Sequence, residues 1–405
     1  MAVVTRDSST IEQLDVPCAI IRGGTSKGVY FRSTDLPPAG ERRDALLKAV
    51  IGSEDLLQID GLGGARLVTA KLAIVGQSTR ADADVDYTYG IVPMGLGRIV
   101  YTSNCGNISA GVGPFAIDAG LVEVSQAESA AGVKVVRIHN TNTDKLLLAH
   151  VPLAADARAS VQGSFSIPGV PGAGAEIFLD YSRTVGAKTG RGMPTGHASD
   201  RIALEDGRSF DVTLCDVANP CLFVAAADLG LMGHELPEQI DANAALLETL
   251  KELRGRAAVL LGLCASWTLA EAESPALPLV VLVAPPASYR DANGSPVSSA
   301  AMDLQARLIF YNRCHESMAG TGSMCTAAAS CIDGSVVHRV VRRMQDGLLH
   351  IGHPLGVMRV VVKTAADGVL AADQALQFER LGFSRTARRL MDGVAHVPNP
   401  DFVRT

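Results

Sequence analysis

The sequence predicts a mixed α/β protein with two domains, and three observations carry this prediction. At 405 residues, the chain is too long for one ordinary hydrophobic core. Short β-branched runs alternate with glycine-rich turns, which suits antiparallel connections better than the strand–helix alternation of a doubly wound sheet. A small-residue helix expected after Cys105 has a weak echo after Ala319. Two related halves would each present a helix N-terminus to a shared cleft.

The first half is expected to consist mainly of strands, with one clear helix. Apolar residues recur at helical spacing over residues 41–51, and two prolines ahead of this segment act as a start signal. The glycine-rich segment 23–28 would join two strands as a hairpin or loop. The expected strands span residues 16–22, 29–32, 67–75, 83–92, 133–139 and 145–152.

Two loop-like segments, residues 163–174 and 186–196, indicate a change of domain because they are rich in glycine and contain prolines. We therefore place the first domain at residues 1–195 and the second at 196–389, with the tail 390–405 returning to the first domain.

The second domain has three expected elements. An amphipathic pattern predicts one helix over residues 237–254, and an apolar run predicts a strand over 277–283. A second small-residue helix is expected to begin near Ser317.

Composition and charge exclude several functions. The net charge is −6, and no lysine- or arginine-rich run is interleaved with aromatics, which argues against a nucleic-acid partner. Prolines interrupt the longest apolar stretch, residues 277–286, which is far shorter than the ~20 residues of a membrane-spanning helix. With no signal region at the N-terminus and eight cysteines of irregular spacing, we expect a cytoplasmic protein with reduced thiols and no membrane partner.

The sequence from Asn104 to Asn107 holds the strongest candidate for chemistry. Cys105 lies between an amide side chain and Gly106, immediately before an apolar segment expected to be a buried helix. If Asn107 or its neighbour caps that helix, the free N–H groups of the first turn point back at the thiol. They would favour its thiolate form and bind a carboxylate. An inert buried cysteine is the alternative.

Lys71 is the second candidate, because it stands inside an otherwise apolar run. Its side chain either reaches solvent, as in many strands, or enters a cleft. Burial would favour the neutral amine, which is the form of a general base. The alternation alone leaves both interpretations open.

Motifs for phosphate, metal and dinucleotide binding are not matched by this sequence. Residues 23–28 contain Ser26-Lys27-Gly28, whose order and position before a strand do not match a phosphate-binding loop. A backbone nest for a carboxylate and a plain tight turn are both consistent with this segment. No metal-binding spacing, hydrolase elbow or dinucleotide fingerprint is present. We therefore expect no cofactor and no metal.

Several motifs together resemble the PrpF family, in the same order along residues 17–395. They are Arg22 to Gly28, Gln58 to Gly64, Lys71 to Val75, Asp84 to Tyr87, Asn104 to Asn107, Pro194 to Gly196, Gly352 to Gly356 and Arg385 to Arg388. The family includes 2-methylaconitate isomerases, 4-oxalomesaconate tautomerases and aconitate Δ-isomerases. The resemblance implies a diaminopimelate epimerase-like fold: two pseudo-symmetric domains, each with a curled mixed sheet around a central helix, and an active site between them.

Two departures refine what the resemblance implies. Epimerases of this fold carry a cysteine at both helix starts, whereas Ala319 stands at the second position here. The resemblance also assigns Lys71 as the catalytic lysine, but Ala70 replaces the serine that commonly precedes it. One cysteine and one lysine indicate an allylic isomerase rather than an epimerase.

We therefore expect a cofactor-independent isomerase that catalyses a 1,3-allylic proton shift or cis–trans isomerisation of an unsaturated tricarboxylate such as aconitate. The alternatives are 2-methylaconitate isomerase, 4-oxalomesaconate tautomerase, an amino-acid epimerase or racemase, and a non-catalytic carboxylate-binding protein. The partner is a small di- or tricarboxylate, and a homodimer stays open. Lys71 and Cys105 are the expected catalytic residues. The expected substrate-binding residues are Arg22, Thr25, Ser26, Lys27, Gly63, Gly64, Thr69, Asn104, Gly106, Asn107, Gly320, Thr321, Gly322, Ser323, His353, Ser384 and Arg385.

Overall fold

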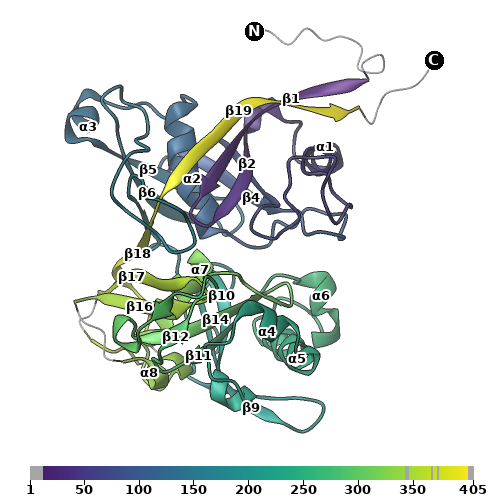
Figure 1. Ribbon diagram of the computed structural model, residues 1–405, viewed down its shortest axis with the longest axis vertical. Helices are drawn as coiled ribbons and strands as arrows, with labels where there is room; N and C mark the ends of the chain where they lie inside the picture. Colours follow the sequence, from purple (N-terminus) through teal and green to yellow (C-terminus); the bar gives the residue numbers. More distant parts are fainter. Residues whose placement is uncertain (1–11, 343–345, 366–367, 372–373, 400–405) are drawn as a thin grey trace.

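The computed structural model describes residues 12–399, apart from 343–345, 366–367 and 372–373. Figure 1 shows two lobes, one above the other. The upper lobe holds the first strands of the chain and the last one, and the lower lobe holds most of the second half.

A curled sheet forms the upper lobe. Its strands are β1 (Gln13–Gly23), β2 (Ser26–Arg32), β3 (Lys71–Gln77), β4 (Val85–Ile91), β5 (Val133–Asn140), β6 (Lys145–Pro152), β7 (Ile177–Asp180) and β19 (Ala387–Pro398). They pair in the order β19-β1-β2-β3-β4-β5-β6-β7, with the β2/β3 and β4/β5 pairs parallel and the others antiparallel. Helix α2 (Gly106–Asp118) packs against β1 to β6 and β19 and lies inside the curl (Figure 1).

The lower lobe repeats this plan. Its strands are β8 (Asp200–Ala203), β9 (Ser209–Val217), β10 (Asn219–Ala225), β11 (Leu279–Ala284), β12 (Tyr289–Arg290), β13 (Pro296–Val297), β14 (Leu304–Phe310), β15 (Arg313–Cys314), β16 (Leu348–His353), β17 (Gly356–Thr364) and β18 (Phe378–Arg385). The order β8-β9-β10-β11-β14-β16-β17-β18 has parallel pairs only at β10/β11 and β14/β16. Helix α7 (Gly320–Ser330) is buried along its whole length, as α2 is along most of its own.

The two sheets therefore share one sequence of parallel and antiparallel pairs. In each lobe a parallel pair is followed by an antiparallel pair and then by a second parallel pair. The central helix connects the two strands of that second parallel pair: α2 lies between β4 and β5 along the chain, and α7 lies between β14 and β16. The internal echo detected in the sequence is a repeat of the whole topology.

The remaining helices lie mainly outside the sheets. They are α1 (Glu41–Ile51), α3 (Gln126–Ala131), α4 (Pro237–Asp241), α5 (Ala244–Leu260), α6 (Ala270–Glu273) and α8 (Val336–Val340). Helix α1 has the predicted bounds, because its apolar positions face a small core formed with β2, β3 and β19.

The lobes are joined by strand pairing. β7 pairs antiparallel with β18, and β19 returns along β1. The division into residues 1–195 with 390–405, and 196–389, stays a proposal. The returning strand starts at Ala387, slightly before the expected tail, and residues 400–405 lie outside the described part.

Two expected elements differ from the structure. The helix predicted over residues 237–254 is wrong as one element: α4 ends at Asp241, and α5 starts at Ala244. The side chain of Asn243 accepts a hydrogen bond of 3.1 Å from the N–H of Leu246, and this cap starts a new helix. The strand predicted over residues 67–75 begins only at Lys71, because residues 67–70 form a turn.

Within residues 12–399 as described, the structure has no helix long and apolar enough to cross a membrane. The same residues contain no cluster of three or more histidine, cysteine, aspartate or glutamate side chains suited to a metal ion.

Candidate active site

The two central helices meet at their N-termini. A Cβ atom on Gly106 would lie 3.1 Å from the Cα of Gly320, and one on Gly320 would lie 3.2 Å from the Cα of Gly106. Only glycine allows such an approach at both helix starts. Because the first-turn N–H groups of both helices lack partners within the helix, this junction concentrates hydrogen-bond donors and positive potential.

Cys105 is itself the N-cap residue of α2, in extended conformation. The sequence left open a cap at Asn107 or its neighbour. The structure places the cap at Cys105, without a side-chain hydrogen bond, and Asn107 lies inside the first turn. The side chain of Asn104 instead accepts a hydrogen bond of 2.7 Å from the N–H of Cys105.

Lys71 is buried, with 3% of its surface exposed, and its side chain reaches the thiol. The Nζ atom lies 3.2 Å from the Sγ of Cys105 and donates to the Oγ of Ser26 at 3.0 Å. Lys71 is the first residue of β3 and Ser26 is the first of β2, and the parallel pairing of these strands places both beside the start of α2. The sequence left open whether the side chain of Lys71 reaches solvent or enters a cleft, and the structure supports the second interpretation.

Asn219 joins the two helix starts and is a residue that the sequence analysis missed. Its Nδ2 donates to the carbonyl of Asn104 at 3.0 Å and to the hydroxyl of Thr321 at 2.9 Å. Its Oδ1 accepts the N–H of Asn104 at 3.2 Å. Nothing in the local sequence distinguishes this asparagine, although it follows Ala218, whose φ of 63° marks a tight turn between β9 and β10.

The topological repeat shows what occupies the equivalent places in the lower lobe. In the upper sheet, Gly28, the third residue of β2, pairs with Lys71, the first residue of β3. In the lower sheet, Cys221, the third residue of β10, pairs with Leu279, the first residue of β11. Leu279 is therefore the counterpart of Lys71, and Ala319, the N-cap of α7, is the counterpart of Cys105. Lys71 and Cys105 both belong to the upper lobe, and apolar side chains stand at the equivalent positions of the lower lobe.

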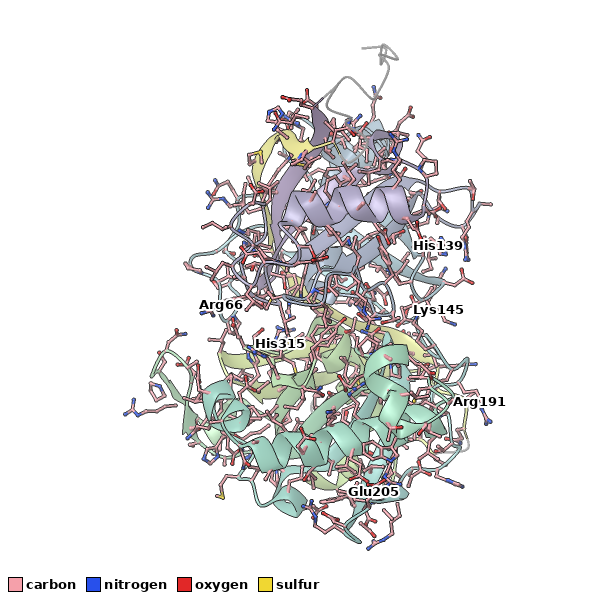
Figure 2. The ribbon with its side chains drawn as sticks, turned by 90° about the vertical axis from the view of Figure 1, so that its right-hand side faces the viewer. Arg66, His139, Lys145, Arg191, Glu205 and His315 are labelled. Atoms are coloured by element: carbon pink, nitrogen blue, oxygen red, sulfur yellow. The ribbon has the colours of Figure 1, made fainter. Side chains whose placement is uncertain are left out.

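His315 is a second residue that the sequence analysis did not place in the site. It lines the same small cavity as Lys71, Cys105, Asn219 and Leu279. Figure 2 labels His315 and Arg66 at the level where the lobes meet. Burial, and then the charge of Lys71, lower the pKa of His315 to about 3. Its Nδ1 accepts the N–H of Ser317 at 3.0 Å, so the neutral ring carries its hydrogen on Nε2.

Asn107 separates this cavity from a larger one. Its Nδ2 donates to the hydroxyl of Thr25 at 3.0 Å, and its Oδ1 accepts from the Nε of Arg385 at 3.0 Å. Thr25 and Arg385 line the second cavity, together with His353 and Ser384. Ten expected binding residues line one of these two cavities or contact Lys71. They are Thr25, Ser26, Asn104, Gly106, Asn107, Gly320, Thr321, His353, Ser384 and Arg385.

Other expected binding residues have structural partners instead. The guanidinium group of Arg22 donates to the carbonyls of Gly24 and Thr386 at 3.0 and 2.9 Å, and so fixes the glycine turn. The N–H of Gly64 donates to the side chain of Gln58 at 3.1 Å. Neither described cavity at the helix junction is lined by the expected residues Arg22, Lys27, Gly63, Gly64, Thr69, Gly322 or Ser323.

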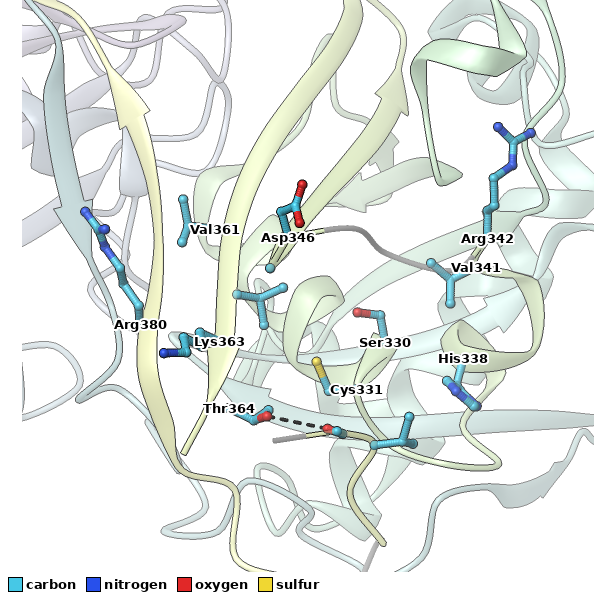
Figure 3. A pocket seen from close by; sticks show the side chains of 14 residues that line it. Ser330, Cys331, His338, Val341, Arg342, Asp346, Val361, Lys363, Thr364 and Arg380 are labelled. Atoms are coloured by element: carbon cyan, nitrogen blue, oxygen red, sulfur yellow. Dashed lines mark hydrogen bonds between the residues drawn. The ribbon is translucent and has the colours of Figure 1, made fainter. Parts of the chain in front are cut away.

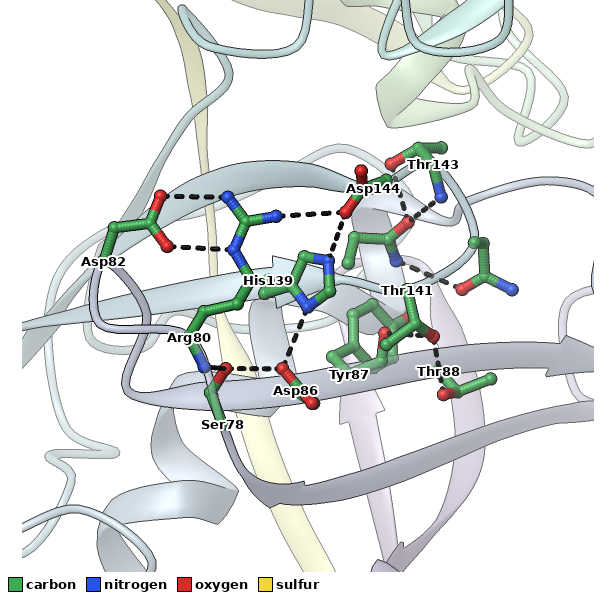
Figure 4. A network of polar contacts seen from close by, with 12 residues as sticks. Ser78, Arg80, Asp82, Asp86, Tyr87, Thr88, His139, Thr141, Thr143 and Asp144 are labelled. Carbon is green, nitrogen blue, oxygen red and sulfur yellow. Dashed lines mark hydrogen bonds and ion pairs between the residues drawn. The ribbon is translucent and has the colours of Figure 1, made fainter. Parts of the chain in front are cut away.

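A hydrogen-bond network supports Asn104 from the upper lobe. His139 lies between Asp86 and Asp144, and Arg80 bridges Asp82 and Asp144 (Figure 4). The neighbouring Asn140, held by Thr143, donates to the Oδ1 of Asn104 at 3.3 Å. The bond from Asn140 therefore supports the helix start, beside the ion-pair cluster around His139.

The largest cavity described, about 790 Å³, lies in the lower lobe and away from this junction. Figure 3 shows it around Cys331 and His338, beyond the C-terminal end of α7. None of the expected site residues lines it.

Comparison with known proteins identifies the family. The family model described as PrpF protein matches residues 13–398. A 3-methylitaconate isomerase of Eubacterium barkeri is 43% identical over 394 residues, which are 97% of this chain and 100% of that protein. A 4-oxalomesaconate tautomerase of Pseudomonas putida is 36% identical over 384 residues, 94% of this chain and 96% of that protein.

Solved structures of similar proteins support this family assignment and the fold. A methylitaconate-delta-isomerase matches with a TM-score of 0.78 and 42% identity, over 98% of each chain. A probable proline racemase of Agrobacterium radiobacter matches with a TM-score of 0.53 and 13% identity, over 93% of this chain and 91% of that one, and shows the fold alone.

The fold is thus of the epimerase-like class, and the predictions of this fold and of an isomerase are confirmed. The chain belongs to the PrpF family.

Proposed function

We propose that this protein is a cofactor-independent isomerase that moves a proton along the allylic system of an unsaturated di- or tricarboxylate, with cis-aconitate as the first candidate. The single observation that carries the proposal is the contact of 3.2 Å between Lys71 and Cys105 at the junction of two helix starts. The relatives named for methylitaconate and oxalomesaconate act on unsaturated acids, which supports the same class of substrate here. Methylitaconate, 2-methylaconitate and oxalomesaconate are therefore the alternatives.

The proposed reaction has two proton transfers and one return step. The amine of Lys71 removes the proton γ to a carboxylate, and the electron pair spreads over the double bond into a dienolate. The thiol of Cys105 then protonates the other end of this system. The resulting ammonium and thiolate are in contact, so one proton transfer from Lys71 to Cys105 restores the starting state. The reverse reaction exchanges the two roles.

The first-turn N–H groups of α2 and α7 would hold the carboxylate that receives the developing charge. Because Lys71 and Cys105 both come from the upper lobe, the proton leaves and returns on one face of the substrate. A two-base racemase needs a second carrier on the opposite face, and Leu279 and Ala319 cannot act as one. This difference favours an isomerase over the racemase alternative.

We further propose a cytoplasmic enzyme without a nucleic-acid or membrane partner, supported by the net charge of −6 and the lack of basic runs interleaved with aromatics. A homodimer stays open.

The Lys71→Ala variant tests the base. We expect kcat/KM to fall by about 10²- to 10⁴-fold, because the transfer of the γ-hydrogen loses its acceptor. The measurement is exchange of substrate hydrogens with deuterated water, followed by NMR with cis-aconitate, trans-aconitate, methylitaconate, 2-methylaconitate and oxalomesaconate. The control is Lys251→Ala, a partly exposed lysine on α5. Undiminished exchange in Lys71→Ala would remove this lysine from the mechanism, and no exchange by the native protein with any of these acids would favour the carboxylate-binding alternative.

The Cys105→Ser variant tests the acid. We expect kcat to fall by a similar factor with KM little changed, because a hydroxyl fits the site but is a far weaker proton donor. Steady-state kinetics with the best substrate of the panel measure both constants. The matched control is Cys264→Ser, another partly exposed free cysteine, in the lower lobe. A normal kcat in Cys105→Ser would show that the thiol does not transfer the proton.

A further inference from the structure

The second cavity, which Asn107 separates from Lys71 and Cys105, is lined by side chains suited to bind an anion. Its volume is about 230 Å³, and it lies between the loop at residues 165–168 of the upper lobe and strands β16 and β17 of the lower lobe. Its lining contains two arginines, a histidine and several hydroxyl groups, and no aspartate or glutamate.

Arg385 is a buried cation without a buried anion. Only 6% of its surface is exposed, and burial lowers the pKa of its guanidinium group to about 10. Its donors reach the amide of Asn107, the carbonyl of Ser384 and the sulfur of Met358 at 3.0, 2.9 and 3.0 Å, and its plane lies 4.3 Å from the ring centre of Phe383. Among the ion pairs of the described residues, none joins Arg385 to a carboxylate. A buried guanidinium group without a carboxylate partner favours the binding of an anion beside it.

His353 adds an oriented neutral donor to the same cavity. Its Nδ1 accepts the N–H of Leu355 at 3.2 Å, so its hydrogen is on Nε2. Burial, followed by the charges of Arg385 and Arg307, lowers its pKa to about 3, and the ring is neutral at pH 7. The hydroxyls of Thr25 and Ser317, 3.1 Å apart, complete this wall, whereas the hydroxyl of Ser384 already donates to Glu176.

The cavity is coupled to the reacting groups by short steps. Thr25 bonds to Asn107, which follows Cys105 by two residues, and Thr25 precedes Ser26, which accepts from Lys71. An acid whose reacting carbons lie at Lys71 and Cys105 therefore has a positively charged cavity next to it.

We propose that this cavity is a carboxylate subsite, in which Arg385 and His353 hold the carboxylate of the substrate that is not conjugated with the reacting double bond. The inference rests on the proposed function, because it assumes that the unsaturated acid reacts at Lys71 and Cys105. It makes Arg385 and His353 the residues that select polycarboxylates over monocarboxylates.

The kinetic test compares each unsaturated acid with its ester at the non-conjugated carboxylate. His353→Asn keeps an acceptor for the N–H of Leu355 but loses the Nε2 donor, and Arg385→Lys keeps the charge but loses the forked donors. We expect either change to lower kcat/KM for the free acid by about 10- to 100-fold, the range of a hydrogen bond to a charged group. We expect the ester to have a low kcat/KM with the native protein, and either change should alter that value by no more than about twofold.

The matched control is Arg380→Ala on the same strand, whose guanidinium group lies 4.7 Å from the ring centre of Phe178 and outside the cavity. It should leave both rate constants unchanged. Equal losses for acid and ester in Arg385→Lys and His353→Asn would overturn the proposal, since they would show that these residues only position Asn107.

A binding measurement separates this proposal from the proposed reaction. Tricarballylate, a saturated tricarboxylate that cannot isomerise, should bind the native protein in calorimetry and bind at least about tenfold more weakly to either variant. If that result is obtained and no acid of the panel is isomerised, the subsite stands and the proposed reaction fails. If isomerisation occurs and both variants bind tricarballylate as tightly as the native protein, the subsite is wrong.

Discussion

At the scale of single residues, the site is defined by one lysine and one cysteine in contact, and by what stands in the equivalent places of the other lobe. Cys105 precedes a helix in the sequence and in the structure. The sequence and the family resemblance already made Lys71 a candidate base, and the structure shows that its side chain is buried. The apolar counterparts Leu279 and Ala319 explain why this fold, which is shared with racemases, is proposed to work here with both proton carriers on one side.

Asn219→Ala tests a positioning residue. The variant removes the amide that pairs with both backbone groups of Asn104 and with the hydroxyl of Thr321. We expect kcat to fall about tenfold or more with KM little changed, because the start of α2 loses its alignment with α7. The free energy of unfolding should fall by about 1–3 kcal/mol, because buried polar groups lose their partner.

The control for Asn219→Ala is Asn243→Ala, which removes the cap of the distant helix α5. It should lower the free energy of unfolding by about 1 kcal/mol and leave kcat unchanged. Urea denaturation and steady-state kinetics on both variants separate the two effects. A loss of stability alone in Asn219→Ala would show that this amide has no role in the alignment of the site.

At the scale of secondary structure, the central helices depend on small residues at their starts. Gly106 and Gly320 both lie against the ring of Phe383, and this ring stacks on Tyr181 with 5.6 Å between ring centres. The aromatic pair therefore sets how closely α2 and α7 approach. The correction at Asn243 has a similar local origin, since one capping side chain divided an apolar pattern that suits a single helix.

Gly106→Ala tests this packing. Its added Cβ would lie 2.9 Å from the Cζ of Phe383 and 3.1 Å from the Cα of Gly320, so the helix starts must separate by a few tenths of an ångström. We expect kcat/KM to fall about tenfold or more, because proton transfer depends steeply on distance, while the melting temperature changes by only a few degrees. Kinetics and thermal unfolding measure the two effects.

The control for this variant is Gly393→Ala in β19, where the added Cβ meets only the side chain of Met391. It should alter neither quantity. If Gly106→Ala kept full activity, close contact of the helix starts would not be needed for the reaction.

At the scale of the whole molecule, the fold buries two neutral histidines, His315 and His353, each with its pKa lowered to about 3 by burial. The unfolded chain protonates a histidine near pH 6.5. Between these values the unfolded state binds more protons, so acid favours unfolding. The free energy of unfolding should fall by about 1.4 kcal/mol per pH unit for each histidine, within the window below pH 6.5.

Urea denaturation at several values between pH 6.5 and 5, above the range where most carboxyl groups titrate, measures this slope. His315→Gln and His353→Asn should each remove about half of the contribution. His197→Gln, at an exposed histidine in the lower lobe, should leave the slope unchanged. The same slope in the native protein and in both buried-site variants would contradict the assignment.

Much of the local structure was determined by the sequence itself. The helix at residues 41–51, the hairpin around the glycine turn, the strand pair that begins at Val133 and the small-residue helix after Cys105 all follow from short-range patterns of apolar, glycine and capping residues. These features depend on interactions between near neighbours in the chain, which a sequence displays directly. The motifs that resemble the PrpF family likewise predicted the fold class and the isomerase.

Only the tertiary structure decided which side chains meet. Lys71 could have faced solvent, and Arg22 was expected to bind substrate along with Arg385, until the pairing of β3 with β2 and of β18 with β17 fixed their surroundings. Asn219 and His315 entered the site from positions more than 100 residues away from Cys105. Contacts of this kind depend on sheet register and on how the two lobes pack, and a short stretch of sequence predicts neither of these.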